Sequence, residues 1–249
     1  ADYGISVKEG KPDFDAIVKR SRGVADKMSG GVQFLMKKNK IDVLMGTGKV
    51  KVGKKVDVTD DKGKTTEYSA KNIVLATGAR SRHLPNLPQD GINIIGYRDA
   101  MVLPKMPKKM VVVGSGAIGV EFAYFYQTMG CEVTVVEYMP NIVPVEDAEV
   151  SKQLERSFKK QGIKIMTNSS VESVDTAGKG CKVKVKTKKG EEILECDVVL
   201  SAVGIEANIE NIGLEEVGIV TDKGKVLVND FYETNIPGYN FDVATGIRY

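Results

Sequence analysis

One stretch near the middle of the chain, residues 111–119, has the sequence VVVGSGAIG and decides the fold. Its apolar first part is typical of a buried strand, and residues 117–129 carry apolar side chains at the spacing of an amphipathic helix. The glycines between them follow the spacing GxGxxG, which is informative only where it joins a strand to a helix. With the next apolar run, residues 132–136, the stretch predicts a βαβ unit from Met110 to Glu137 that binds a dinucleotide.

The three glycines have separate roles in such a unit. Gly114 permits the tight turn after the strand, Gly116 lets the backbone approach a pyrophosphate, and Gly119 lets the helix pack closely on the strand. The free N–H groups and the positive dipole end of the new helix hold the phosphates. We therefore expect a phosphate site formed by Gly114, Ser115, Gly116, Ala117, Ile118 and Gly119.

The carboxylate of Glu137 indicates which dinucleotide binds. It follows Gly119 by 18 residues and ends the second strand, where a carboxylate can accept hydrogen bonds from both ribose hydroxyls of the adenosine. The same charge would repel a 2′-phosphate. No arginine follows Glu137 until Arg156, so the usual phosphate clamp is missing. The sequence therefore predicts NAD rather than NADP.

Glu121 has two interpretations. It follows Gly119 by two residues, and we expect it in the first turn of the helix, where the dipole alone favours a carboxylate. A charge that only stabilises the start of the helix is one interpretation. A role near the nicotinamide is the other.

The composition indicates a globular protein without a strongly charged partner. The chain has 249 residues, 42% of them apolar, and its 36 basic and 33 acidic residues nearly cancel. The lysines are spread along the chain, so we expect no nucleic-acid partner. No apolar run approaches the roughly 18 residues of a membrane span, so we expect no membrane partner. The N-terminus lacks the pattern of a signal peptide, and we expect a soluble, cytoplasmic protein.

The cysteines and the histidine do not have the spacing of a metal site. Cys131, Cys181 and Cys196 form no CxxC or CxxxxC pair, and His83 is the only histidine of the chain. A structural zinc site would need a cluster of such ligands, so we expect no metal. The three thiols are expected to be small core or surface residues.

Helices and short strands are predicted before the βαβ unit. Residues 13–38 carry apolar side chains at helical spacing, interrupted by Gly30-Gly31, and predict two packed helices. An antiparallel meander is expected next, with strands at residues 41–45, 49–52, 56–59 and 65–69. Residues 72–76 form a continuous apolar run, which predicts a strand buried on both faces that ends at Thr77-Gly78-Ala79.

After a connecting segment, the sequence predicts an alternation of strands and helices. Residues 80–109 are rich in proline and have little periodicity, which indicates a crossing between domains and a boundary near Pro107. Strands at residues 110–113, 132–136 and 163–167 then alternate with helices at 117–129 and 148–161, the pattern of a doubly wound βαβαβ half. A second meander, residues 171–175, 181–187 and 192–196, and a buried strand, residues 198–202, are expected to follow.

Several stretches together resemble one known family. They are residues 31–39 (GVQFLMKKN), 70–79 (AKNIVLATGA), 114–122 (GSGAIGVEF), 135–137 with 142–144, and 202–204 with 208–214 (NIENIGL). On these residues the chain is similar to the pyridine-nucleotide disulfide oxidoreductases. The KKN and ENxGL segments favour the dihydrolipoamide dehydrogenase branch of that family.

The resemblance implies an α/β fold with an inserted domain. A Rossmann-like NAD-binding domain, built from a doubly wound parallel sheet plus a β-meander, would occupy residues 108–226. It would be inserted into a partial FAD-binding domain of the same type, residues 1–107 and 227–249. Glu121, Val171 and Gly204 would join Glu137 and the glycine loop at the NAD site, with Glu121 beside the nicotinamide and the flavin. The residues implied at the FAD site are Gly48, Thr77, Gly78 and Ala79.

The activity implied by the resemblance is the reoxidation of dihydrolipoamide with FAD and NAD. The partner would be the lipoyl protein of a 2-oxo acid dehydrogenase or glycine-cleavage complex, and the enzyme would be a homodimer. The family has its own FAD-binding GxGxxG at the start, a CxxxxC redox pair and a His-x-x-x-x-Glu acid–base pair, and this sequence has none of them. We therefore expect no catalytic residue in this chain, which begins without a methionine, and we expect a fragment of a longer enzyme.

The sequence also departs from the family at two places in the cofactor sites, and alternative functions stay open. Gly204 is followed by Ile205-Glu206-Ala207 where the family often has arginine and proline, and Asp242 would have to replace the aspartate of a flavin motif. Another flavin disulfide reductase, such as a mercuric reductase or a transhydrogenase, is one alternative function. A non-catalytic NAD-binding redox module is the other.

Overall fold

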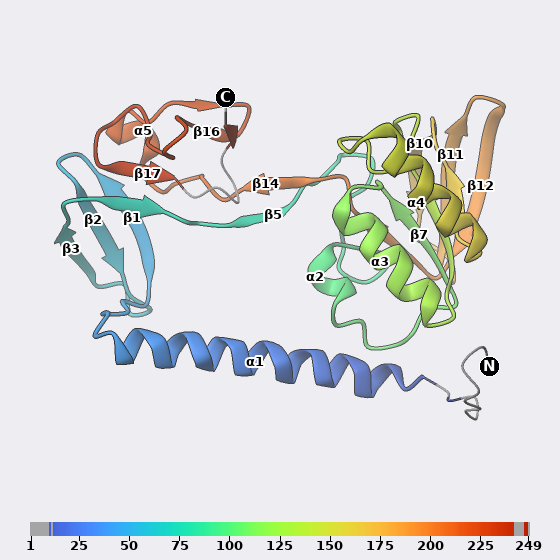
Figure 1. Cartoon of the computed structure of the whole chain (residues 1–249), viewed down its shortest axis with the longest axis horizontal. Helices are drawn as coiled ribbons and strands as arrows, with labels where there is room; N and C mark the ends of the chain where they lie inside the picture. Colours follow the sequence, from blue (N-terminus) through green and yellow to red (C-terminus); the bar gives the residue numbers. More distant parts are fainter. Residues whose placement is uncertain (1–9, 11, 242–246, 249) are drawn as a thin grey trace. The chain divides into compact units, whose positions relative to one another are not determined.

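The structure, a computed structural model, describes residues 10, 12–241 and 247–248. The chain forms two compact units (Figure 1). Unit 1 contains the described residues up to Ser29 together with His83–Gly204, and unit 2 contains Gly30–Arg82 together with the described residues from Ile205 onward. No helix within the described residues is long and apolar enough to cross a membrane. Asp242, considered above for a flavin motif, lies outside the described residues.

Unit 1 is built on a parallel five-stranded sheet. Its strand order is β6-β13-β7-β8-β9, and every neighbouring pair is parallel. The strands are β6 (Ile94–Ile95), β13 (Val198–Ser201), β7 (Lys109–Val113), β8 (Glu132–Val136) and β9 (Lys164–Met166). Apart from β6, they lie where the sequence predicts strands, and the predicted α/β fold is confirmed.

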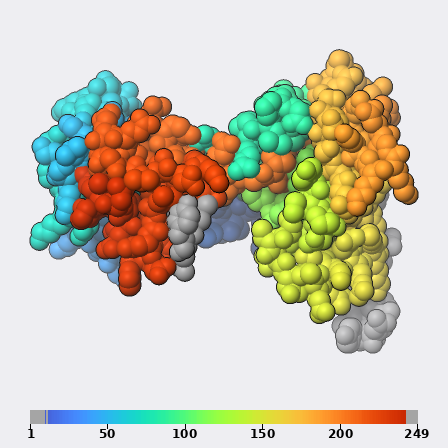
Figure 2. Space-filling view, turned by 90° about the horizontal axis from the view of Figure 1, so that it is seen from above, coloured from blue at the N-terminus to red at the C-terminus, as the bar shows by residue number. Residues whose placement is uncertain are grey.

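Successive side chains of β7 pack on opposite faces of this sheet. Met110 and Val112 belong to the core that includes side chains of α3 (Ala117–Thr128) and α4 (Ala148–Lys160). Val111 and Val113 belong to a second core, beneath the antiparallel meander of β10 (Ser170–Asp175), β11 (Cys181–Thr187) and β12 (Gly190–Cys196). Because side chains alternate along a strand, the two helices cover one face of the sheet and the meander covers the other. The meander forms the orange surface of unit 1 in Figure 2.

Unit 2 consists of short sheets around a separate core. The strands β1 (Thr47–Lys51), β2 (Lys55–Thr59) and β3 (Thr65–Ser69) form an antiparallel meander. β4 (Ile73–Leu75) pairs in parallel with β17 (Tyr239–Phe241), and β5 (Ala79–Ser81) pairs antiparallel with β14 (Ile205–Ala207). The remaining elements are β15 (Thr221–Asp222), β16 (Lys225–Val228), β18 (Ile247–Arg248) and the short helix α5 (Leu214–Val217). Ile73 and Tyr239, far apart in the sequence, thereby share one core.

One long helix replaces the two helices predicted for residues 13–38. The helix α1 (Phe14–Lys38) is continuous through Gly30 and Gly31. A glycine in a helix interior costs only about 1 kcal/mol relative to alanine, so a pair of glycines weakens a long helix without breaking it. The prediction of two helices is therefore wrong.

Three predictions about strands are also wrong. Residues 41–45 form no strand, and the first meander starts at Thr47. The strand β4 is not buried on both faces, because Val74 is 65% exposed and β4 has only β17 as a neighbour in its sheet. Residues 80–109, expected to be a plain connection, contain β6 at one edge of the parallel sheet and the short helix α2 (Tyr97–Ala100).

Packing within the chain explains two of the three glycines of the loop. Gly114 has a φ of +95°, and a Cβ there would lie 2.5 Å from the carbonyl oxygen of Ala202. A Cβ on Gly119 would collide with the carbonyl oxygen of Gly114, because α3 starts directly against the loop. A Cβ on Gly116, in contrast, would meet no atom within 4 Å. The fold therefore requires Gly114 and Gly119 but gives no reason for Gly116.

We expect Gly119→Ala to lower the free energy of unfolding by about 1–3 kcal/mol, because the added methyl group must displace a close-packed backbone. Gly178→Ala is the matched control, since a Cβ on Gly178 meets nothing within 4 Å. Urea unfolding followed by circular dichroism measures both variants. Equal loss of stability in the two would contradict this account of the contact.

Candidate dinucleotide-binding site

The loops of the candidate site share one edge of the parallel sheet. The strands β7, β8 and β13 run in the same direction, so their carboxyl ends meet there. Gly114 follows β7 directly, Glu137 follows β8 directly, and Gly204 follows the end of β13 by three residues. The strand order reverses at β7, which has β8 on one side and β13 on the other. Open α/β sheets bind their ligands at such a reversal, outside the carboxyl ends of the strands.

The helix α3 begins at the glycine loop without a side-chain cap. Its N-cap residue is Gly116, which adopts an extended conformation. The first N–H groups of a helix have no partner within the helix, so those of Ala117 and Ile118 can bind an acceptor from outside it. The helix dipole adds a partial positive charge at the same place. Together with the open space beside Gly116, the loop has the shape and the polarity of a phosphate site.

The Glu137 carboxylate accepts three hydrogen bonds, two of them from the glycine loop. Its Oε2 accepts from the backbone N–H of Ser115 at 2.8 Å and from the Ser115 hydroxyl at 2.6 Å. Its Oε1 accepts from the backbone N–H of Met139 at 2.8 Å. Glu137 is only 6% exposed, and a buried charge is tolerated when it is hydrogen-bonded in this way. A carboxylate accepts about four hydrogen bonds, so about one acceptor position is left for a ligand hydroxyl.

Glu121 lies farther along α3 than predicted. The helix begins at Ala117, so Glu121 belongs to its second turn, and no acidic residue occupies the first turn. The effect of the helix dipole falls off within the first turn. The prediction of a first-turn position is therefore wrong, and the interpretation of Glu121 as a charge that stabilises the helix start loses its basis.

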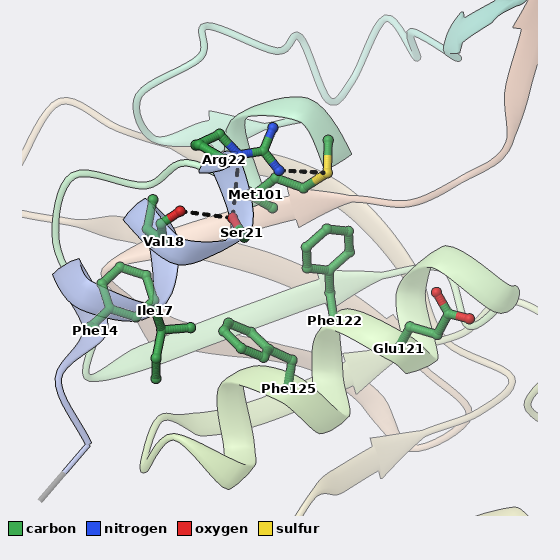
Figure 3. A pocket seen from close by; sticks show the side chains of 10 residues that line it. Phe14, Ile17, Val18, Ser21, Arg22, Met101, Glu121, Phe122 and Phe125 are labelled. Carbon is green, nitrogen blue, oxygen red and sulfur yellow. Dashed lines mark hydrogen bonds between the residues drawn. The ribbon is translucent and has the colours of Figure 1, made fainter. Parts of the chain in front are cut away.

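Glu121 also lines a cavity of unit 1 with a volume of about 320 Å³. Much of its wall is apolar and comes from the start of α1 and from α3, including Phe14 and Phe122. Figure 3 shows the Glu121 carboxylate at one side of the cavity and the Arg22 guanidinium at another, where it donates a hydrogen bond to the Ser21 hydroxyl. The sequence did not predict this cavity, because the α1 side chains that line it have the spacing of ordinary core residues.

The segment just before Val171 is hydrogen-bonded to the residue that follows β8. The backbone N–H of Ser169 donates to the carbonyl of Glu137 at 2.9 Å, and Val171 follows two residues later as a buried residue of β10. Its carbonyl accepts from the side-chain amide of Asn86 at 2.7 Å. Asn86 had no assigned role in the sequence analysis, and its only sequence signal is a position within the proline-rich segment.

Gly204 follows β13, which lies on the side of β7 opposite β8, and the segment that leads to it lies against the glycine loop. Gly204 has a φ of +114°, a conformation that favours glycine. The carbonyl of Ala202, two residues before it, lies against Gly114. The structure thus brings the glycine loop, Glu137 and the chain leading to Gly204 together at one sheet edge, with Val171 next to the chain that leaves Glu137.

The residues expected at a flavin site lie in unit 2, in the strands β1 and β5 and in the turn that precedes β5. Gly48 belongs to β1 of the meander, whereas Thr77 and Gly78 follow β4. The side chain of Asn208 donates to the carbonyl of Thr77 at 3.1 Å, and its backbone N–H donates to the carbonyl of Gly78 at 3.0 Å. Gly78 has a φ of +71°, so its own turn already requires a glycine. Ala79 continues from this turn into β5.

The three thiols are all in the core. Cys131, Cys181 and Cys196 are buried. Burial raises the pKa of Cys131 and of Cys196 to about 12. A thiol in this environment stays protonated near neutral pH and is a poor nucleophile. Within the described residues, no group of three or more His, Cys, Asp or Glu side chains is arranged to hold a metal ion.

Comparisons with known proteins identify the family of this chain. Residues 5–239 match the family model described as pyridine nucleotide-disulphide oxidoreductase. Dihydrolipoyl dehydrogenase of Zymomonas mobilis is 43% identical over 237 residues, which are 94% of this chain and 50% of that protein. Dihydrolipoyl dehydrogenase of Rhizobium etli is 43% identical over 255 residues, covering 95% of this chain and 53% of that protein.

A solved structure shows the same likeness in three dimensions. The crystal structure of LpdA from Mycobacterium tuberculosis superimposes with a TM-score of 0.87 at 29% identity and covers 95% of this chain and 52% of its own. The chain spans about half the length of the curated relatives it matches. The resemblance stated from the sequence motifs is confirmed, and the chain belongs to the pyridine nucleotide-disulphide oxidoreductase family.

Proposed function

We propose that the carboxyl edge of the unit 1 sheet binds NAD(H), with its pyrophosphate at the loop of residues 114–119. The observation that carries this proposal is the open space at Gly116. Gly114 and Gly119 are required by contacts within the chain, whereas a Cβ on Gly116 would touch nothing. A ligand phosphate against this backbone explains why the position has no side chain, and the N–H groups of Ala117 and Ile118 at the start of α3 are near enough in sequence to bind it.

The choice of NAD over NADP rests on Glu137. Its carboxylate is fixed at the end of β8 by Ser115 and Met139, so it cannot swing away to admit a 2′-phosphate without losing these bonds. A ribose hydroxyl can donate to the acceptor position that remains. A phosphate in the same place would set like charges against each other in a buried site.

The remaining residues of the site would orient the nicotinamide half of the dinucleotide. When bound, this group supplies hydride transfer. Glu121, on the second turn of α3, would lie beside it, and Gly204 and Val171 would line the site on either side of the loop. Ser115 has a positioning role, because its N–H and hydroxyl hold the Glu137 carboxylate.

For the whole protein we propose an NAD- and FAD-dependent dihydrolipoyl dehydrogenase. The support is the 43% identity to proteins of that name over nearly all of this chain. Such an enzyme would be a cytoplasmic homodimer that reoxidises the dihydrolipoamide of a lipoyl protein in a 2-oxo acid dehydrogenase or glycine-cleavage complex. Residues 108–226 would be its NAD-binding domain, and residues 1–107 and 227–249 would belong to its FAD-binding domain, with Gly48, Thr77, Gly78 and Ala79 against the flavin.

A non-catalytic NAD-binding module is the second candidate function. The observation in its favour is the burial of all three thiols, which keeps them protonated near neutral pH. It shares the NAD site with the first candidate and differs only in the absence of electron transfer. Both candidates therefore predict the same dinucleotide binding by the 249 residues.

We expect Gly116→Ala to weaken NAD binding about tenfold, because the methyl group would occupy the space next to the loop that the phosphate needs. The free energy of unfolding should change little, since no atom lies within 4 Å of the new Cβ. Isothermal titration calorimetry with NAD and a urea unfolding curve measure the two quantities, and Gly178→Ala is again the control. Undiminished NAD affinity in Gly116→Ala would contradict the proposed phosphate position.

Replacement of Glu137 with alanine should lower the ratio of NAD affinity to NADP affinity toward one. The same change leaves the buried donors of Ser115 without an acceptor, so the free energy of unfolding should fall by about 1–3 kcal/mol. Titrations are therefore performed at a temperature where the variant is folded. Glu132→Ala, which removes an exposed carboxylate from the same strand, is the matched control. An unchanged affinity ratio in Glu137→Ala would remove the basis for the ribose assignment.

The 249-residue chain by itself should bind NAD, bind FAD poorly and show no turnover of dihydrolipoamide. The reason is that the described flavin residues amount to a turn and two strand positions, and that the thiols are buried and protonated. Absorbance at flavin wavelengths after purification and an NADH-formation assay with dihydrolipoamide measure both. A yellow protein with stoichiometric flavin would contradict the first part, and turnover would contradict the second.

A further inference from the structure

Cys181 and Cys196 lie directly opposite each other in the hairpin formed by β11 and β12. They are Cα partners in the antiparallel register of these strands. Residues directly opposite each other in an antiparallel pair have Cα atoms about 4.5–5.5 Å apart. A disulfide bond needs Cα atoms about 4.4–6.8 Å apart. The backbone therefore already has the spacing of a disulfide-bonded pair.

The two side chains also point to the same side of the hairpin. Both belong to the core beneath the parallel sheet, together with Val183 and Val185 of the same hairpin. The Cys181 sulfur lies 3.6 Å from the carbonyl oxygen of Asn93, which accepts its hydrogen bond. The strand register and the shared core place the two thiols side by side without any movement of the backbone.

We propose that Cys181 and Cys196 are a redox-sensitive pair that hydrogen peroxide converts into a cross-strand disulfide. In the first step the sulfur of Cys181 attacks one peroxide oxygen and the O–O bond breaks, which gives a sulfenic acid and one water. In the second step the sulfur of Cys196 attacks that of Cys181, the S–O bond breaks, and the hydroxyl leaves with the Cys196 proton as a second water. The two thiols lose two electrons and two protons, and one peroxide is reduced to two waters.

Cys181 is the thiol that reacts first. Burial raises the pKa of both thiols, and interaction with the Cys196 thiol opposes this effect at Cys181. At Cys196, burial and the neighbouring Cys181 both raise the pKa, which reaches about 12 although the backbone of Val111 opposes the shift. Cys181 and Cys196 are 2% and 7% exposed, so peroxide must reach them through local opening of the structure, and we expect the reaction to be slow.

The test is a map of the cysteines in the unmodified 249-residue chain after incubation with hydrogen peroxide. Free thiols are alkylated, the protein is digested without reductant, and the peptides are weighed by mass spectrometry. We expect the peptides of Cys181 and Cys196 to be joined, with a mass two hydrogen atoms below their sum, and to separate on treatment with dithiothreitol. Cys131, equally buried but without a neighbouring thiol, should be recovered separately and serves as the internal control.

Two variants extend the test. Cys131→Ala should form the same joined peptide at the same rate, whereas Cys196→Ala should leave Cys181 to pass from sulfenic to sulfinic acid without a link. Recovery of Cys181 and Cys196 as separate peptides, either alkylated or singly oxidised, would overturn the proposal. So would a link from either one to Cys131 or to a second chain. The unmodified chain decides the question even where a variant fails to fold.

Discussion

The close contact between Gly119 and the carbonyl of Gly114 is the constraint on which unit 1 depends. No side chain fits at Gly119, so α3 starts directly against the end of β7. This start places the unpaired N–H groups of the helix at the carboxyl edge of the sheet, and it also sets the depth at which Val120 and Ala123 enter the core. One backbone contact therefore fixes both the packing of the helix on the sheet and the direction of the groups proposed to bind phosphate.

The glycine loop also holds Glu137, the residue that follows the neighbouring strand β8. A buried carboxylate is costly unless its charge is hydrogen-bonded, and here two of the three donors belong to Ser115 of the loop. The charge is thus held in place by the same loop that would hold the pyrophosphate. Any change that moves the loop also moves the carboxylate, so the proposed phosphate and ribose contacts cannot be altered independently. The proposed selection of NAD is therefore a property of the loop and the strand together.

The parts of this structure that the sequence predicts are those with a local cause. The strands and helices from Met110 to Ile165 follow from an alternation of apolar runs and helical spacing, with Gly114 and Gly119 placing the turn and the helix contact. The failures have causes that are not local. Gly30 and Gly31 do not break α1, because an established helix tolerates them. The two-residue strand β6 exists only because β13 lies beside it, and nothing in its short sequence distinguishes it from a loop.

In the candidate site, too, the sequence predicts the features that have a local cause and misses those that depend on contacts between distant segments. Residue types at the expected spacing indicate Gly116 and Glu137, but no spacing rule indicates that Ser115 donates to Glu137 or that Asn208 holds the turn at Gly78. These bonds join segments whose approach depends on the folded sheet. The burial of the cysteines is a further example, since it places Cys181 and Cys196 in the core that also holds Val111 and Val113 of β7. The strand β7, which ends at the glycine loop, therefore packs on the hairpin that carries the two cysteines, and a covalent bond in that hairpin would make the packing beneath the loop more rigid.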